Sequence, residues 1–317
     1  MRRRPPQRFP TRSAGAIVAA IVLAGCGSPG PSASPAGSFS PPVTFSASPE
    51  PSVGGLLIAW SGPIQVTDET GALGALPRSP AEVSAVAAGS GRIVAISPPV
   101  KAFTADALAS PVEWQPIDLS AAGDRLTTLV AVSADGRRMA MVGGAMQADA
   151  FDLDTVDLPG GPIHRLTIPR GANGPPAWLD DKTVVVDVIT RAGASGLAAI
   201  DISNGAVTDR FGPGIEASFS ADGSRVALIA DGGDVLVANA QSWRSGLLDG
   251  SVGLPGRSDQ TAERVAISPD GTRVAVVRSS TTRPTIVEIW LFANGAWAEA
   301  VAIPVGGDGP ATIAWLR

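Results

Sequence analysis

The sequence predicts an all-β protein in which residues 56–317 form a six-bladed β-propeller, preceded by an export signal and a disordered tether. One short segment recurs through these residues at a nearly constant interval, as expected for the blades of a ring. The two ends of the same region supply complementary parts of one blade. A third observation is the change of composition near residue 55, where a Pro- and Ser-rich segment gives way to alternating apolar runs.

The repeat reads apolar–Ser–x–Asp–Gly–x–Arg–apolar–Ala–apolar in its three complete copies. Counting weaker and truncated copies, it begins at Val86, Val132, Trp178, Phe219, Ile267 and Trp315. The intervals between these starts are 46, 46, 41, 48 and 48 residues. Intervals in this range, with β-branched runs and turn residues between them, are typical of propeller blades of four strands.

The unit near residue 270 shows how one blade is made. Its four predicted strands, from the channel outward, are 263–267, 272–277, 285–292 and 296–303. Asp270-Gly271 forms the first turn, because Gly tolerates positive φ and Asp caps the turn with its side chain. The other blades are predicted at about 82–119, 128–168, 175–211 and 215–249. Asp135, Asp222 and Asp270 recur at one place in each unit, so we interpret them as turn formers rather than catalytic acids.

The sixth blade is predicted to be shared between the two ends of the region. Residues 311–316 read as one inner strand, after which the sequence stops. Residues 56–60, 64–68 and 71–76 read as three strands that lack an inner one. One strand and three strands make a complete blade, so the ring is expected to close without a free edge.

The N-terminal residues predict export and a lipid anchor. Five arginines precede a short apolar run that is too short to span a bilayer, which is the pattern of a signal peptide at residues 1–25. The run ends in Leu23-Ala-Gly-Cys26, which resembles the bacterial lipobox and implies a diacylglycerol thioether on Cys26. The alternative is a Cys that lies by chance near an ordinary cleavage site. Residues 26–55 are otherwise mostly Pro, Ser, Gly and Ala and are expected to be a disordered tether.

Charge and cysteine content exclude several classes of function. Without the signal the chain keeps 19 Lys and Arg against 29 Asp and Glu, a net charge of −10. An acidic protein of this kind is not expected to bind nucleic acid. Cys26 is the only cysteine, so no disulfide is expected in the ring, which must be stable through its core alone.

The repeats resemble those of a known group of propellers. Ser268-Pro-Asp-Gly271 and Ser220-Ala-Asp-Gly223 are similar to the WD40-like repeats of TolB-type propellers. The longer run from Arg264 to Val277 resembles the propeller of actinobacterial LpqB-type lipoproteins. The resemblance implies a fold and does not imply a function, because propellers host many unrelated activities.

No catalytic motif stands out. His164, the only histidine, is expected on an exposed outer strand. Asp149, Asp152, Asp154 and Asp157 suggest a calcium loop, but the Gly and Glu that such a loop needs are missing, and a solvated strand face is the preferred interpretation. Four tryptophans are expected to pack between blades, namely Trp60, Trp178, Trp290 and Trp315. Three lie nearer loops and are weaker candidates for a binding surface, namely Trp114, Trp243 and Trp297.

Two functions fit these observations. The first is a membrane-anchored extracytoplasmic binding module, monomeric and without a cofactor, for a protein or a component of the cell envelope. The alternative is a metal-dependent hydrolase or lactonase with a metal in the channel, for which the inner strands offer Glu82, Glu216 and Glu263.

The binding hypothesis predicts which face to examine. In a propeller, the connections between blades and the loops between second and third strands lie at the same end of the ring. That end is expected to gather many arginines with a few acids, namely Arg78, Arg125, Arg170, Arg191, Arg257, Arg264, Arg278 and Arg283 with Glu82, Asp124, Asp259 and Glu263. Arginine suits protein and anion recognition, and Arg191, Arg264 and Arg283 are the residues predicted to bind the partner.

Overall fold

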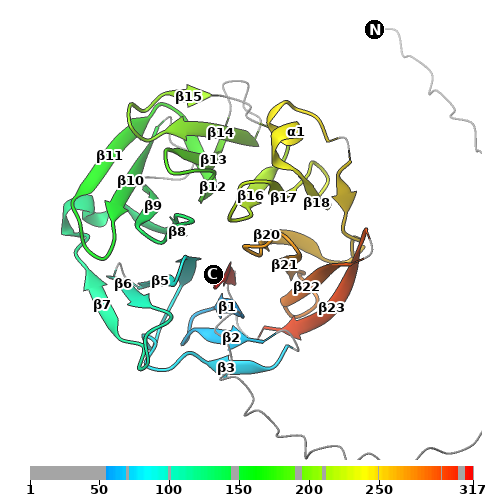
Figure 1. Ribbon diagram of the computed structural model, residues 1–317, viewed down its shortest axis with the longest axis horizontal. Helices are drawn as coiled ribbons and strands as arrows, with labels where there is room; N and C mark the ends of the chain where they lie inside the picture. The colour runs from blue at the N-terminus through cyan, green and yellow to red at the C-terminus, as the bar shows by residue number, and fades with distance from the viewer. Residues whose placement is uncertain are drawn as a thin grey trace, which may run out of the picture. The chain divides into compact units, whose positions relative to one another are not determined.

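The computed structural model contains six four-stranded antiparallel sheets arranged as a ring (Figure 1). The structure describes residues 55–68, 71–98, 101–143, 150–189, 195–208, 212–248, 250–293, 295–305 and 311–316. The predicted signal peptide, Cys26 and all of the tether before Gly55 lie outside these residues. In the described part, no helix is long and apolar enough to cross a membrane.

Each blade runs from an inner strand at the channel to an outer strand at the rim. In this order the blades are β4 (Ala85–Gly89), β5 (Arg92–Ser97), β6 (Lys101–Asp106) and β7 (Trp114–Ile117); β8 (Leu126–Val132), β9 (Arg138–Gly143), β10 (Phe151–Asp157) and β11 (Ile163–Ile168); β12 (Gly171–Trp178), β13 (Thr183–Ile189), β14 (Ser195–Asp201) and β15 (Val207–Thr208); β16 (Ile215–Phe219), β17 (Arg225–Ile229), β18 (Val235–Asn239) and β19 (Val252–Gly253); β20 (Thr261–Ile267), β21 (Arg273–Ser279), β22 (Ile286–Ala293) and β23 (Ala296–Pro304); and β24 (Thr312–Trp315), β1 (Leu56–Ala59), β2 (Gln65–Thr67) and β3 (Leu73–Ala75). A 3-10 helix at Ser120–Arg125 and the short helix α1 at Ala240–Arg244 complete the described elements.

The shared blade is confirmed. β24 is the inner strand, and it pairs antiparallel with β1 in a register that joins Leu56 to Trp315 and Ala59 to Thr312. Leu316 N donates to Gly55 O at 3.2 Å, just beyond the paired strands. Segments from the two ends of the region therefore lie side by side at the centre of the ring (Figure 1).

The repeated Ser–x–Asp–Gly–x–Arg segment forms the turn between the first and second strands. In the copy at residues 268–273, Ser268 Oγ donates to the Asp270 carboxylate at 2.5 Å and accepts from Arg273 N at 2.9 Å. Gly271 has φ of +70°, a conformation that glycine adopts without strain. Equivalent hydrogen bonds recur in the copies at 133–138 and 220–225, which confirms that these aspartates form turns.

In the three complete copies of the repeat, the arginine joins its blade to the next one. The guanidinium of Arg225 lies 4.7 Å from the ring centre of Phe292 in the following blade, and its Nη1 donates to Gly271 O at 2.8 Å. Arg138 stacks in the same way on Trp178, and Arg273 on Trp315, at 5.1 and 4.8 Å. The repeat therefore encodes an inter-blade clamp as well as a turn.

The apolar core lies between neighbouring sheets. One cluster combines Ala227 and Val237 of one blade with Val274 and Val276 of the next. The four tryptophans predicted to pack between blades belong to such clusters. Trp243 is a correction: it is fully buried in α1, and its Nε1 donates to Pro213 O at 3.0 Å, so it is part of the core and not of a surface.

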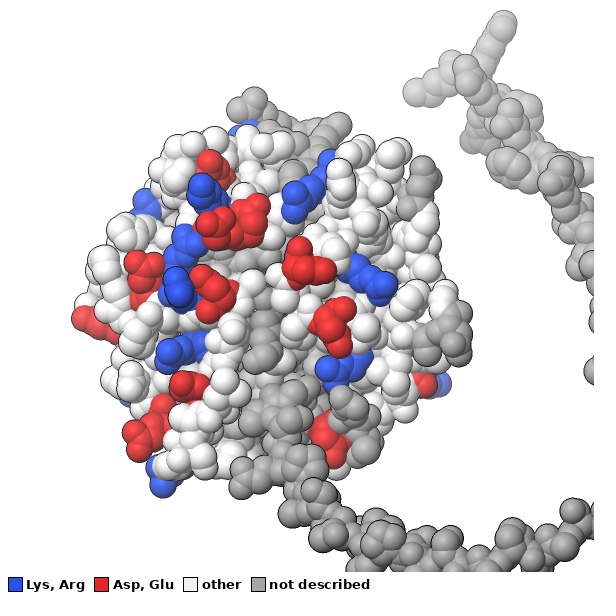
Figure 2. Space-filling model, in the orientation of Figure 1, with Lys and Arg blue, Asp and Glu red and all other residues white. Residues whose placement is uncertain are grey.

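The ring has two faces that we name by their connections. The turn face carries the repeated turns at 133–138, 220–225 and 268–273, and the described chain begins there, at Gly55. The connection face is the opposite end, where the chain passes from one blade to the next. On the face shown in Figure 2, acidic and basic side chains are interspersed around the ring and form no patch of a single sign.

The clamp predicts a matched pair of stability changes. Replacing Arg225 with Met removes the stacking on Phe292 and the hydrogen bond to Gly271, and should lower the free energy of unfolding by about 1–2 kcal/mol. Arg244→Met is the control, because Arg244 is exposed on α1. Urea denaturation followed by circular dichroism measures both. Equal stability of the two variants would contradict the clamp.

Candidate functional site

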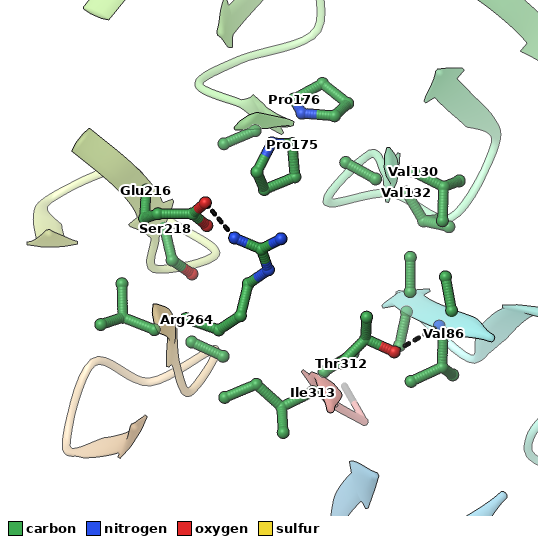
Figure 3. Close-up of a pocket in the computed structure, with 18 of the residues that line it drawn as sticks. Val86, Val130, Val132, Pro175, Pro176, Glu216, Ser218, Arg264, Thr312 and Ile313 are labelled. Atoms are coloured by element: carbon green, nitrogen blue, oxygen red, sulfur yellow. Dashed lines mark hydrogen bonds and ion pairs between the residues drawn. The ribbon is translucent and has the colours of Figure 1, made fainter. Parts of the chain in front are cut away.

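The central channel contains a cavity of about 180 Å³ that all six inner strands line (Figure 3). Small or apolar side chains from β4, β8, β12 and β24 form most of its wall. The charged residues that line it are Glu216 from β16 and Arg264 from β20. Among the lining residues, the other four inner strands contribute no titratable side chain.

Glu216 occupies an irregular point of its strand. The pairing of β16 with β17 is interrupted between Ile215 and Ser218, and Glu216 has φ of +54°, in the left-handed region. Its N–H is turned out of the sheet and donates to both carboxylate oxygens of Asp187, at 3.0 and 2.9 Å. A left-handed backbone costs a residue with a side chain on the order of 1 kcal/mol or more, and here the Asp187 carboxylate stabilises it. This conformation directs the Glu216 side chain into the channel (Figure 3).

Asp187 is held in place by the neighbouring inner strand. It lies on β13 and is 1% exposed. A Cβ at Gly174 would lie 2.5 Å from Asp187 Oδ2, so only glycine fits opposite this carboxylate. Gly174 belongs to β12, where the register shifts between Ala172 and Pro176. Irregular segments of β12 and β16, the inner strands of two adjacent blades, therefore allow the Asp187 carboxylate to meet the Glu216 N–H.

Arg264 completes the cluster from the next blade. Its Nη1 donates to a Glu216 carboxylate oxygen and to Glu263 O, the latter at 3.0 Å. The Glu263 carboxylate accepts a hydrogen bond from Ser279 Oγ. Among the described residues, Nε and Nη2 of Arg264 have no hydrogen-bond partner. In the view down the channel, this side chain reaches toward the middle with Glu216 on one side (Figure 3).

Burial changes the acidity of both carboxylic acids. It raises the pKa of Glu216 to about 8; Arg264 opposes this shift, whereas Asp187 and Glu263 add to it. Burial likewise raises the pKa of Asp187 to about 7, although the hydrogen bond from Glu216 N–H and the charge of Arg264 both act to lower it. The cluster therefore exchanges protons near neutral pH while the arginine keeps its charge.

The structure places the predicted partner-binding residues in different environments. Arg264 is in the channel, and its side chain is 26% exposed. Arg283 is on the connection face, 62% exposed, with its Nε 2.7 Å from Asp259. Arg191 lies outside the described residues.

The carboxylates suggested for a channel metal do not come together. Glu82 is exposed in the connection before β4, Glu216 is paired with Arg264, and Glu263 is bonded to Ser279. Among the described residues, no group of three or more His, Cys, Asp or Glu side chains is placed to hold one metal ion.

Two of the arginines expected on the connection face are structural, which corrects that prediction. Arg278 is 1% exposed, and its Nε donates to the buried Glu288 at 2.7 Å. Arg257 pairs with the same Glu288 and donates to Glu299 at 3.1 Å. Trp290 Nε1 also donates to Glu288, at 3.1 Å. These arginines hold the loop after β19 against the blade.

The acidic residues of β10 are a second correction. Asp152 and Asp154 are buried and do not form a solvated face. Arg165 binds Asp154 through two hydrogen bonds of 2.8 and 2.9 Å, and Thr167 Oγ1 donates to Asp152 at 2.7 Å. Asp149 lies outside the described residues. His164 is exposed on the outer strand β11, as predicted.

Sequence reasoning missed Asp187, although a signal for it exists. It is the one charged residue in the run Thr183–Ile189, which is otherwise β-branched and apolar. A lone charge in a strand that is buried on both faces needs a specific partner. Glu288 stands in a similar apolar run on β22 and could have been found in the same way.

The comparisons with known proteins bear on the fold. The sequence matches no protein-family model and no curated protein. The crystal structure of TolB from Acinetobacter baumannii superposes with a TM-score of 0.61 at 18% identity, over 83% of this chain and 67% of that chain. The fold is that of a TolB-type propeller. The structure of a putative TolB from Agrobacterium tumefaciens gives a TM-score of 0.53 at 15% identity, over 79% of this chain and 89% of that chain.

A peptidase also appears among the similar structures. The puromycin-hydrolyzing peptidase of Mycobacterium tuberculosis has a TM-score of 0.48 at 14% identity, over 75% of this chain and 40% of that chain. At sequence identities this low, similarity to a solved structure indicates the fold and does not indicate the activity. The resemblance to LpqB-type lipoproteins stays a prediction.

The raised pKa values of Glu216 and Asp187 predict how stability depends on pH. The folded protein keeps a proton on Glu216 up to about pH 8, whereas an ordinary Glu releases it near 4.5. The free energy of unfolding should therefore fall as pH rises through this window. Glu216→Gln cannot titrate, so it should be more stable than the wild type by roughly 1 kcal/mol or more near pH 9 and lose that advantage near pH 4.

The measurement is a series of thermal melts across this pH range. Glu113→Gln is the control, because Glu113 is exposed. Parallel pH profiles for wild type and Glu216→Gln would show that Glu216 keeps an ordinary pKa.

Proposed function

We propose that this chain is an extracytoplasmic binding module, anchored to a membrane through Cys26, whose propeller holds a protein or cell-envelope partner. The observation that carries the proposal is the cluster in the channel. A left-handed Glu216, fixed by a buried Asp187, is hydrogen-bonded to Arg264 inside a cavity whose other lining residues are uncharged and mostly apolar.

The ring itself does not require this cluster. β4, β8, β12 and β24 line the same cavity without a charged side chain and still close the ring. The cluster costs backbone strain and the desolvation of two acids, which a purely structural position avoids. Strained and buried ionisable residues gather at functional sites, so the cluster supports a binding role for the channel.

The connection face is the side on which we place the partner. Arg283 and Asp259 are exposed there, and Arg264 lies toward that end of the channel, near the beginning of β20. A closed ring is rigid, and a rigid surface loses little entropy on binding. Arg191, Arg264 and Arg283 remain the residues proposed to bind the partner.

Site-specific photo-crosslinking tests which face is used. A photoreactive residue at Thr282, exposed on the connection face, should give a defined adduct with an envelope component in intact cells. The same residue at Thr272 is the matched control, because Thr272 is exposed on the turn face of the same blade. Combining Arg264→Ala and Arg283→Ala should weaken the Thr282 adduct. An adduct only from Thr272 would move the partner to the turn face.

The anchor has its own test. Cys26→Ser should abolish lipid attachment and move the protein from the membrane fraction to the soluble fraction or leave its signal uncleaved. Intact-mass spectrometry of the wild-type mature protein should show a diacylglycerol on an N-terminal Cys26. A mature wild-type chain that begins at another residue and carries no lipid would disprove the lipoprotein assignment.

A further inference from the structure

We propose that the channel binds an alkyl carboxylate, with the carboxylate on the unpaired edge of Arg264 and the alkyl group against the apolar wall. This deepens the proposed function, on which it rests, by naming the chemistry that the channel recognises. The source of the group is either the free C-terminus of a polypeptide or a small carboxylic acid.

The geometry of Arg264 is the first step. Nη1 is bonded to Glu216 and to Glu263 O, which fixes the plane of the guanidinium. Nε and Nη2 form the other edge, with no partner among the described residues. Two parallel N–H donors match the two oxygens of a carboxylate, the bidentate geometry that Arg165 already shows with Asp154.

The cavity limits the size and polarity of the ligand. Its volume of about 180 Å³ is near that of an apolar cavity of roughly 150 Å³ that accepts benzene. Val86, Val130, Pro175 and Ile313 are among the side chains that line it (Figure 3). A short alkyl chain or one small C-terminal residue fits this space, whereas a nucleotide or a folded domain is too large to enter it.

The neighbouring acids determine the sign of the ligand's charge. The charged or titratable groups around the bound carboxylate would be Arg264, Glu216, Asp187 and Glu263. When Glu216 and Asp187 hold protons, Arg264 supplies an uncompensated positive charge. A cationic ligand would be repelled by that charge, and a carboxylate would be attracted. As the acids ionise at higher pH they repel the ligand, so its binding is coupled to proton uptake.

Isothermal titration calorimetry of the full chain in detergent tests the proposal with three probes. They are N-acetyl-alanyl-alanine with a free carboxylate, the same dipeptide as its C-terminal amide, and propionate. We expect the free acid to bind at least about tenfold more tightly than the amide, because the amide loses the charged hydrogen bonds. The affinity of the free acid should fall by up to about tenfold per pH unit once the pH exceeds the raised pKa values of Asp187 and Glu216.

Three variants locate the site. Arg264→Gln should weaken binding of the free acid by about tenfold or more. Glu216→Gln should bind the acid more tightly than the wild type near pH 9, with a flatter pH profile, because one repelling charge is gone. Arg244→Gln, exposed on α1, is the control and should bind as the wild type does. If Arg264 only stabilised the fold, the loss of its partner in Glu216→Gln would not make the acid bind more tightly.

Each outcome decides a question. Propionate binding as tightly as the dipeptide identifies a small acid as the source, and binding of the dipeptide acid alone identifies a C-terminus. Equal binding of the acid and the amide by the wild-type protein, or no binding of any probe at about 10 mM, overturns the inference. Because the Thr282 crosslink requires no carboxylate probe, an adduct without probe binding would preserve the proposed function and reject only this ligand.

Discussion

The pairing of β24 with β1 is the contact on which the rest of the structure depends. It joins strands more than 250 residues apart in the chain and makes the sixth blade complete. Without it, the sheet formed by β1, β2 and β3 would have no inner strand, and β4 and β20 would each lose their neighbour at the channel. All six inner strands line the channel of the closed ring, so its side chains are positioned by the whole ring and not by one blade.

The inter-blade clamps lie on the turn face, where they hold neighbouring blades together. Arg138, Arg225 and Arg273 each lie over an aromatic ring of the following blade. In the opposite direction, Trp315 Nε1 donates to Ala266 O at 3.0 Å, which ties the closing blade back to its predecessor. These contacts set the angle between blades. On the connection face, Arg278 and Arg257 both bind the buried Glu288 and hold the loop after β19 against the β20–β23 blade.

Local chemistry explains why the fold could be predicted. The Ser–Asp–Gly turn is formed by residues within six positions of one another, so its spacing in the sequence records the blades directly. The strands of the blade at 261–304 were placed within about two residues of their observed ends for the same reason. Arg278 was misplaced because its partner Glu288 is on another strand, and its neighbours in sequence suggested an exposed loop.

The channel cluster could be predicted only in part, for a physical reason. Glu216 and Arg264 were singled out as residues, but nothing near Glu216 in sequence indicates a positive φ. That conformation depends on Asp187, 29 positions earlier, and on the absence of a side chain at Gly174. It is a tertiary effect between two neighbouring blades, β12–β15 and β16–β19.

A carboxylate site in a protein of net charge −5 is physically consistent. Exposed charges farther than a Debye length of about 10 Å are largely screened, so the net charge acts weakly on a ligand inside the channel. The ligand interacts mainly with the channel cluster, where the raised pKa values of Asp187 and Glu216 leave Arg264 as the charge that persists at neutral pH. Arg264 is 26% exposed and partly shielded by the channel, so its guanidinium edge attracts an anion more strongly than a fully solvated arginine would. The two acids thereby set the pH range in which the channel is available, and the arginine sets the chemistry it accepts.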